Sequence, residues 1–539
     1  MSNLSGVQDV QESKHTRIAI WIIYFIGIVH WLGFFFLVFH EMSDRALIQS
    51  FINNPNPVEL FESRPFDAND WYREMYMQEG VQIALRTHTV PFHLNMTDNP
   101  GLSQTFHKNR FLGTPSWTMS PQVILLYFLD TQTFAIVNLL FLYSIGFLGC
   151  LLLRKHYQLG LLPFFFLFLL FNFNGYFVEK ITAYGPSQLG YFLMPYMILV
   201  MFRAMELKFS DCRNHISLGV WLGVVLVAML YQGSLHLYVE CVTFVLIWGL
   251  ANYRLWRVPL VAFLVTFSVG FVRLFPAAVS SGTAPNHHYA EWGGYTSPQI
   301  LINAFVDLRT QLDSPAFGWW EQSLYVSLPG LFLLVFLGMV PSFLKLSWEK
   351  FTIWKSLTLP CIIMLLISIR HFKHYIIPNW IPLLNAESMT TRYMIIPLAL
   401  VTVIAAINLQ GLLKEYCHLK RVKYLMVLSI GVITCFLFNH TREWRMHKVQ
   451  DEFYWWHNSF DKAGLLYHQQ MLGTHLYINN NMGDIIYIAA FYIGLLVSLL
   501  SSIVVVCWLW RDWKRGRARG GQHINSALSK TWRCISRSE

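Results

Sequence analysis

Long apolar segments, separated by short polar connections, recur along the whole chain. The first of them, residues 18–39, exceeds 20 residues, and a helix of that length crosses a hydrocarbon core of about 30 Å. The others lie near residues 133–153, 158–175, 188–205, 216–232, 237–251, 257–278, 323–345, 356–370, 392–408, 423–438 and 485–510. The sequence therefore predicts an all-α polytopic membrane protein with about twelve transmembrane helices.

The distribution of charge indicates the orientation of these helices. Charged residues make up 13% of the chain, about half the share typical of soluble proteins. The formal net charge is +10, and the basic residues gather in short connections and in the C-terminal segment RDWKRGRARGG. This pattern predicts cytoplasmic termini, and membrane lipids rather than nucleic acid as partners of the basic residues. The eight scattered cysteines indicate no disulfide scaffold and no paired metal site.

The spacing of polar segments predicts a single membrane domain, residues 18–510, between an N-terminal cytoplasmic tail at 1–17 and a basic cytoplasmic tail at 511–539. The first apolar segment lacks a small-residue cleavage site, which favours an uncleaved start-transfer helix. The long outer loops are expected at residues 40–118, 279–322, 371–391 and 439–484. Because loops on a rigid scaffold commonly carry function, we expect the chemistry on this outer side.

The first outer loop holds the main cluster of candidate catalytic groups. Asp67 and Asp70 lie at the start of a segment, residues 70–87, whose spacing predicts an amphipathic helix along the membrane interface. Glu41 and Asp44 lie about one helical turn apart, just beyond the first apolar segment. Each carboxylate also has an ordinary interpretation, because an Asp at a helix start caps backbone N–H groups and interfacial acids are commonly solvated.

The order of several short motifs resembles that of the C-type glycosyltransferases (GT-C), most closely their YfhO-like branch. The motifs of the first loop are Asp67-Ala-Asn-Asp70 before an aromatic pair, and Gly113-Thr-Pro115. The later motifs are Tyr184-Gly-Pro-Ser-Gln188, Tyr231-Gln-Gly-Ser-Leu-His236, Arg273-Leu-Phe-Pro276, Trp320-Glu321-Gln-Ser-Leu-Tyr325 and Glu387-Ser-Met-Thr-Thr-Arg392. The resemblance covers roughly residues 18–410. It implies transfer of a sugar from a polyprenyl-phosphate-linked donor to a hydroxyl of a glycan, lipid or protein acceptor, on the outer face of a bacterial inner membrane.

Such a transfer needs a base for the acceptor hydroxyl and positive charge for the departing phosphate. One carboxylate suffices, because phosphate leaves without help from a general acid of the kind that glycoside hydrolysis needs. The resemblance therefore implies Asp70 as the general base, with Asp67 as the alternative. The side chains expected to contact donor or acceptor are Arg392, Arg273, Glu41, Asp44, Lys373, His374, Glu321 and His288. Glu179 and Lys180 are further polar candidates, and for every cation snorkelling to the interface is the competing interpretation.

Two other functions are compatible with the same chain. A transporter or flippase of lipid-linked glycans would have broken helices and ionisable groups in mid-membrane, of which the predicted spans contain few. A membrane O-acyltransferase would need a histidine deep within a span, and His236 is the best candidate. His287-His288 and the pair His371 and His374 have ligand chemistry, but their aromatic neighbours favour interfacial or substrate contacts. We therefore expect no metal site formed by the protein's side chains. A divalent cation as a cofactor remains an alternative.

Overall fold

The computed structural model describes residues 14–42, 70–96, 110–114, 118–281, 293–308, 319–341, 351–372, 389–446, 476–478 and 484–535. Within these ranges the regular structure is helical, except for one two-stranded antiparallel sheet of β1 (Leu94–Met96) and β2 (Leu476–Ile478). Its register pairs Leu94 with Ile478 and Met96 with Leu476. The predicted helical class is therefore confirmed for the described part of the chain.

The described helices are of two kinds, long apolar helices and short helices between them. The α-helices are α1 (Lys14–Met42), α4 (Asp70–Thr87), α5 (Thr131–Tyr157), α6 (Leu161–Asn172), α7 (Gly175–Tyr184), α8 (Met194–Glu206), α9 (Cys212–Tyr231), α10 (Leu235–Ala251), α11 (Arg257–Val269), α12 (Phe271–Ser281), α13 (Pro298–Val306), α14 (Leu328–Leu333), α16 (Phe351–Ser368), α19 (Ile395–Glu415), α20 (Lys420–Met446) and α23 (Ile485–Ile535). The short 3-10 and π elements are η3 (Phe111–Gly113), η4 (Pro121–Tyr127), η5 (Gly185–Leu193), η6 (Tyr253–Leu255), η8 (Trp319–Glu321), η9 (Leu334–Met339) and η10 (Thr390–Met394).

Length and hydropathy identify the membrane-spanning elements. Among the described residues, seven helices are long and apolar enough to cross a membrane, or up to nine if each of two bent pairs counts as one span. Three shorter apolar helices accompany them, at Leu235–Ala251, Leu328–Met339 and Trp354–Ser368. The chain is therefore a multi-pass membrane protein.

The span that the sequence predicts at residues 257–278 is broken, and the one predicted at residues 158–175 continues past a bend into α7. Helices α6 and α7 meet at 42°, and α11 and α12 meet at 71°. At the first break, Asn174 Nδ2 donates to Leu170 O and Phe171 O, while its Oδ1 accepts the N–H of Phe177 and so caps α7. The amide thus supplies hydrogen bonds that the interrupted helix loses. At the second break the chain turns at Gly270, whose missing side chain leaves room beside Thr266 O.

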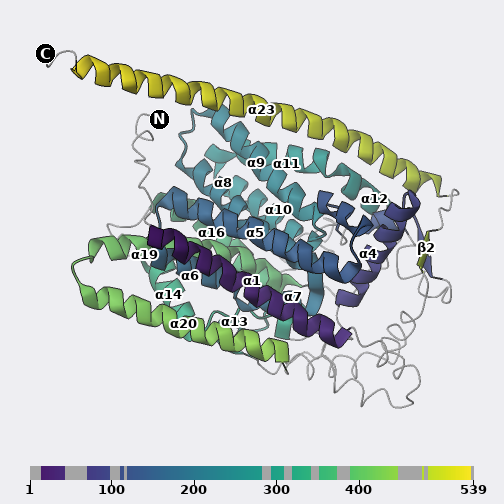
Figure 1. Ribbon diagram of the computed structural model, residues 1–539, viewed down its shortest axis with the longest axis horizontal. Helices are drawn as coiled ribbons and strands as arrows, with labels where there is room; N and C mark the ends of the chain where they lie inside the picture. Colours follow the sequence, from purple (N-terminus) through teal and green to yellow (C-terminus); the bar gives the residue numbers. More distant parts are fainter. Residues whose placement is uncertain are drawn as a thin grey trace.

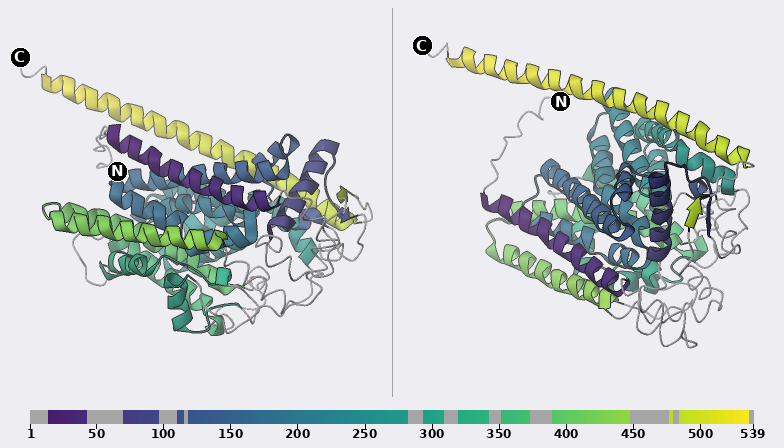
Figure 2. Two further views of the ribbon diagram at one scale, coloured as in Figure 1. Left: turned by 60° about the horizontal axis from the view of Figure 1, so that its bottom comes forward. Right: turned by 45° about the vertical axis from the view of Figure 1, so that its right-hand side comes forward.

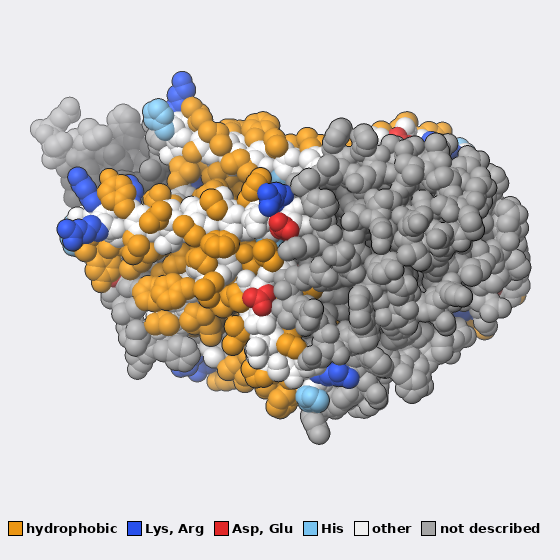
Figure 3. Space-filling view, turned by 90° about the horizontal axis from the view of Figure 1, so that it is seen from below, with side chains coloured by type: hydrophobic (Ala, Val, Ile, Leu, Met, Phe, Trp, Pro, Cys, Tyr) orange, Lys and Arg blue, Asp and Glu red, His pale blue; other side chains and the backbone are white. Residues whose placement is uncertain are grey.

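The two ends of the helical bundle differ in character. In Figure 1, α1 and α20 begin toward the left, and α5 and α23 end there. Helix α4 and strand β2 lie at the right. The left end carries Arg154 and Lys155 at the end of α5 and Lys420 and Arg421 at the start of α20, and blue side chains gather there in Figure 3. We call it the basic end and the opposite one the loop end. The rods α1, α20 and α23 keep this common direction in both views of Figure 2.

Close helix packing in the bundle uses small residues at four-residue spacing. Gly219 and Gly223 on α9 face α11, where an added Cβ would lie 2.8 Å from Val258 O and from Ala262 O respectively. The absent side chains let the two backbones approach closely. In a membrane such packing is needed, because the lipid is as apolar as the helices and no hydrophobic effect drives them together. Apolar side chains on α1, α20 and α23 stay exposed, as a lipid-facing surface requires.

At the loop end, the segment that follows α4 is tied to the start of α23. Arg110 Nε and Nη2 donate to the carboxylate of Asp484, and Tyr487 Oη donates to Phe92 O and accepts the N–H of Gly113. These bonds and the β1–β2 pairing fix the first loop against the last helix. We call the ion pair of Arg110 and Asp484, with the neighbouring His93, the loop clasp.

Candidate functional site

In the interior of the described part of the chain lies an ion triad of Lys180, Glu321 and Arg392. Arg392 Nε lies 3.0 Å from Glu321 Oε2 and its Nη2 lies 2.5 Å from Oε1. Lys180 Nζ donates to the same Oε2. None of the three residues is more than 5% exposed. The carboxylate is therefore held between an ammonium and a guanidinium, away from water, in the arrangement that buried charges require.

Three separate elements bring the triad together. Lys180 belongs to α7, Glu321 ends η8, and Arg392 lies in η10, directly before α19. Thr391 Oγ1 also donates to Glu321 O at 2.6 Å, which fixes η8 against η10. Burial alone would raise the pKa of Glu321, but the charges of Arg392 and Lys180 outweigh burial and lower that pKa well below its ordinary value. Glu321 is therefore ionised at neutral pH.

A second buried pair lies next to the triad. His440 Nε2 is 2.7 Å from Glu179 Oε1, and both side chains are fully buried. The ring of Tyr325 stacks on that of His440 at 4.4 Å between centroids. Because Glu179 and Lys180 are consecutive in α7, this helix contributes one charge to each pair. His440 lies six residues before the end of α20, so both pairs lie near the loop end of the bundle.

The structure brings together two of the side chains expected to contact substrate, Glu321 and Arg392, and places Arg273 elsewhere. Arg273 lies in α12, is 1% exposed, and has Nη1 3.9 Å from Met119 Sδ. Glu41 is in the last turn of α1, but its side chain lies outside the described part of the chain. The expected residues that lie wholly outside the described ranges are Asp67, Asp44, Lys373, His374 and His288.

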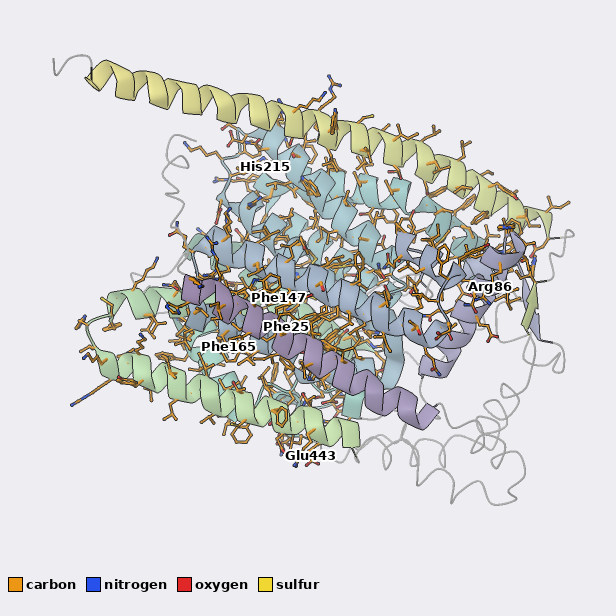
Figure 4. The ribbon with its side chains drawn as sticks, viewed as in Figure 1. Phe25, Arg86, Phe147, Phe165, His215 and Glu443 are labelled. Carbon is orange, nitrogen blue, oxygen red and sulfur yellow. The ribbon has the colours of Figure 1, made fainter. Side chains whose placement is uncertain are left out.

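The helix predicted for residues 70–87 is confirmed as α4, which begins at Asp70 and ends at Thr87. The side chain of Asp70 lies outside the described part. Gln82 Nε2 anchors the helix by donating to Leu126 O at 3.1 Å and Leu129 O at 2.6 Å. Helix α4 packs against α5, α7, η4 and η5, and Figure 4 shows its Arg86 at the loop end, whereas His215 lies toward the basic end. The helix that Asp70 opens is thus in contact with the helix that carries Lys180.

Three members of the buried charge group were missed or undervalued by reasoning from sequence. Glu179 and Lys180 were expected only as sugar contacts, and His440 was not expected at the site. The signal available for them was their position inside apolar segments, since an ionisable residue at membrane depth is a functional candidate by default. Lys180 pairs with Glu321 across 141 positions and Glu179 pairs with His440 across 261, and no local pattern can reveal such pairings.

A metal centre needs several ligating side chains close together. Within the described ranges, no three His, Cys, Asp or Glu side chains gather closely enough to hold a metal ion. His287 and His288 lie outside these ranges. The described arrangement provides three things: cationic groups near the end of the spans, an imidazole hydrogen-bonded to a carboxylate, and a helix that begins with an aspartate.

The fold and this site define a multi-pass membrane protein with a buried charge group near one end of its helical bundle. No protein-family model, curated protein or solved structure matches the chain.

Proposed function

We propose that this chain is a GT-C-type membrane glycosyltransferase that moves a sugar from a polyprenyl-phosphate-linked donor to an acceptor hydroxyl. The observation that carries the proposal is the contact between α4, which begins with Asp70, and α7, which contributes Lys180 to the ion triad. The two helices thus bring a carboxylate and a cation to the end of the spans. A lipid-borne phosphate and a water-borne hydroxyl would meet at this depth.

In this proposal the loop end faces the extracytoplasmic side of a bacterial inner membrane and the basic end faces the cytoplasm. The basic residues at the ends of α5 and α20 support that orientation. Counting the three shorter apolar helices as spans, together with each bent pair as one, would give the twelve spans that the sequence predicts.

The proposed chemistry uses Asp70 as the proton acceptor. As the oxygen of the acceptor hydroxyl forms its bond to the anomeric carbon, its proton passes to the carboxylate, and the bond from that carbon to the phosphate oxygen breaks. The position of Asp70 as first residue of α4 favours its ionised form, because a helix N-terminus stabilises negative charge. Arg273 and Arg392 are the proposed source of positive charge for the departing phosphate.

The test is transfer of label from polyprenyl-phosphate donors. Membranes containing the protein are supplied with undecaprenyl phosphate carrying radiolabelled glucose, galactose or mannose, and label that leaves the donor fraction for a new glycan, lipid or protein product is measured. Asp70→Asn should lower transfer by about 100-fold or more, as loss of a general base does. The protein's melting temperature should change little, because Asn keeps much of the capping capacity.

Asp130→Asn is the matched control for this substitution. Asp130 is also an aspartate at a helix start at the loop end, and its Oδ1 accepts the N–H of Thr133 at 2.8 Å. We expect near-normal transfer from this variant. Absence of transfer from all three donors, or normal transfer by both Asp70→Asn and Asp67→Asn, would contradict the proposal.

The two bent spans favour a second function, transport of a lipid-linked glycan. Broken helices next to buried ionisable groups are typical of transporters, and Lys180 and Arg273 both follow such breaks. Proteoliposomes that contain a fluorescent polyprenyl-phosphate sugar separate the two functions. Movement of the intact lipid between leaflets without a covalent product would identify a transporter, whereas a labelled product identifies a transferase.

A further inference from the structure

The turn that follows α9 is a meeting point of segments far apart in the sequence. The N–H of Met119 donates to Tyr231 O at 2.7 Å, and Thr118 Oγ1 donates to Gln232 O at 3.3 Å. The N–H of Gly190 in η5 donates to Ser234 Oγ at 2.8 Å. Residues 118–120, η5 and the turn at 231–234 are therefore held against one another near the loop end.

Four buried side chains of these segments and of α4 have polar atoms that no described group satisfies. They are both side-chain atoms of Gln78, Ser120 Oγ, Gln188 Oε1 and Gln232 Oε1. None of the four residues is more than 5% exposed. Gln78 reaches this region because α4 packs against both η4 and η5, and because Met77 beside it shares an apolar cluster with Met119 and Tyr231.

Unpaired polar atoms in a protein interior need an explanation. Leaving one buried donor or acceptor unsatisfied costs about 1–3 kcal/mol, and folded proteins leave few of them. Here five such atoms occur on segments that meet at a single turn. The cost is understandable if a ligand supplies the missing partners when it binds.

The chemistry of the four groups defines the kind of ligand. An amide offers a carbonyl acceptor and an N–H donor, and a hydroxyl offers both functions, while neither carries charge. A neutral polyhydroxylated molecule presents the same two functions from every hydroxyl. Arg273 is a cation beside these segments, because its Nη1 lies 3.9 Å from the Sδ of Met119. Met119 stands between Thr118 and Ser120 in the sequence. An anionic group of the ligand would therefore lie toward α12.

We infer that the region around the turn at 231–234 is the sugar-binding part of the donor site, with Gln78, Ser120, Gln188 and Gln232 binding hydroxyl groups and Arg273 binding the attached phosphate. This inference rests on the proposed function for the nature of the donor. It assigns the sugar and the phosphate to separate groups of residues.

The first test measures binding to the protein in nanodiscs. The probes are farnesyl phosphate and its glucosyl, galactosyl and mannosyl phosphodiesters. At least one sugar-bearing probe should bind the wild-type protein about tenfold or more tightly than farnesyl phosphate does. The double variant Gln188→Met/Gln232→Met should lose most of this preference and keep its affinity for farnesyl phosphate, whereas Arg273→Met should weaken all four probes.

The second test measures the melting temperature without ligand. Gln232→Met and Gln188→Met should leave it unchanged or raise it, because each removes a buried amide oxygen without a hydrogen-bond partner and puts an apolar group of similar size in its place. Asn174→Leu is the matched control, since that buried amide donates to Leu170 O, Phe171 O and Tyr191 Oη. Its loss should lower the melting temperature.

Two results would overturn the inference. One is that no sugar-bearing probe binds the wild type more tightly than farnesyl phosphate, or that the double variant keeps the preference. The other is that the glutamine variants melt as early as Asn174→Leu, which would show that the amides are bonded within the protein. If the protein binds the sugar-bearing probes selectively but transfers no sugar, only the proposed function is refuted. If the double variant transfers sugar normally, only the inferred sugar-binding site is refuted.

Discussion

Arg110 donates hydrogen bonds from Nε and Nη2 to the two carboxylate oxygens of Asp484, at 2.6 and 2.8 Å. The two residues are 374 positions apart, and their ion pair joins the segment before η3 to the residue before α23. His93 Nε2 lies 3.3 Å from the same carboxylate. A two-pronged, partly buried pair of this kind is stronger than an exposed one, so the loop clasp holds the first loop in place.

The first prediction concerns the stability of the loop clasp. The side chains of Arg110 and Asp484 are 11% and 17% exposed, so Arg110→Ala should lower the free energy of unfolding by about 1–3 kcal/mol. Thermal unfolding in detergent measures the loss. Arg442→Ala removes a more exposed pair with Glu443 and should have little effect. Equal effects of the two substitutions would show that the clasp is no stronger than a surface pair.

The loop clasp should also depend on pH. Burial would raise the pKa of Asp484, but hydrogen bonds and charge from Arg110 and His93 lower it below its ordinary value. A carboxyl group with a lowered pKa contributes stability above its unfolded value near 4, and loses that contribution as pH falls through the lowered value. The difference in melting temperature between wild type and Arg110→Ala should therefore shrink on acidification below about pH 4. A difference that stays constant down to pH 3 would contradict this account.

A second prediction concerns the ion triad. Glu321→Gln leaves Lys180 and Arg392 buried without their shared carboxylate, and removal of one member of a buried ion group costs about 3–5 kcal/mol. We expect an early melting temperature and poor recovery from the membrane. Replacing all three residues by Met should recover much of the stability, because the carboxylate and its two cations are then removed together. Failure of the triple variant to melt later than Glu321→Gln would show that charge balance is not the cause.

A third prediction concerns the position of α7. An added Cβ at Gly175 would lie 2.5 Å from Tyr325 N, and the N–H of Gly175 donates to Tyr325 O. Gly175→Ala must push α7 away from the segment that holds Glu321 and should lower the stability by about 1–3 kcal/mol. Gly431→Ala is the control, because nothing lies within 4 Å of an added Cβ there. Similar melting temperatures for the two variants would contradict the close approach.

A fourth prediction concerns membrane orientation. Helix α1 begins and α23 ends at the same end of the bundle, so reporter fusions after residues 60 and 525 should lie on opposite sides of the membrane. Alkaline phosphatase, which is active outside, should be active only at residue 60, and green fluorescent protein should fluoresce only at residue 525. The same compartment for both fusions would refute the positive-inside assignment.

Local patterns in the sequence were sufficient for the elements. Apolar length identified the helices that can cross a membrane, and the bounds of the helix predicted at residues 70–87 agree with α4 at both Asp70 and Thr87. These features depend on hydrophobicity and helical periodicity, which neighbouring residues in the chain express by themselves. The break at Gly270 was harder to see, because this residue lies within an apolar run that also permits a continuous helix.

The amino-acid sequence by itself thus determined that the protein is helical and polytopic, that its basic residues gather in short connections, and that a helix begins at Asp70. Only the tertiary structure decided which charges pair, placing Lys180 and Arg392 on Glu321 and His440 on Glu179. It also decided that Arg273 lies beside Met119. The physical reason is that each burial of a charge is tolerated only with a partner at contact distance. That partner is set by how helices bend and pack, not by the order of residues along them.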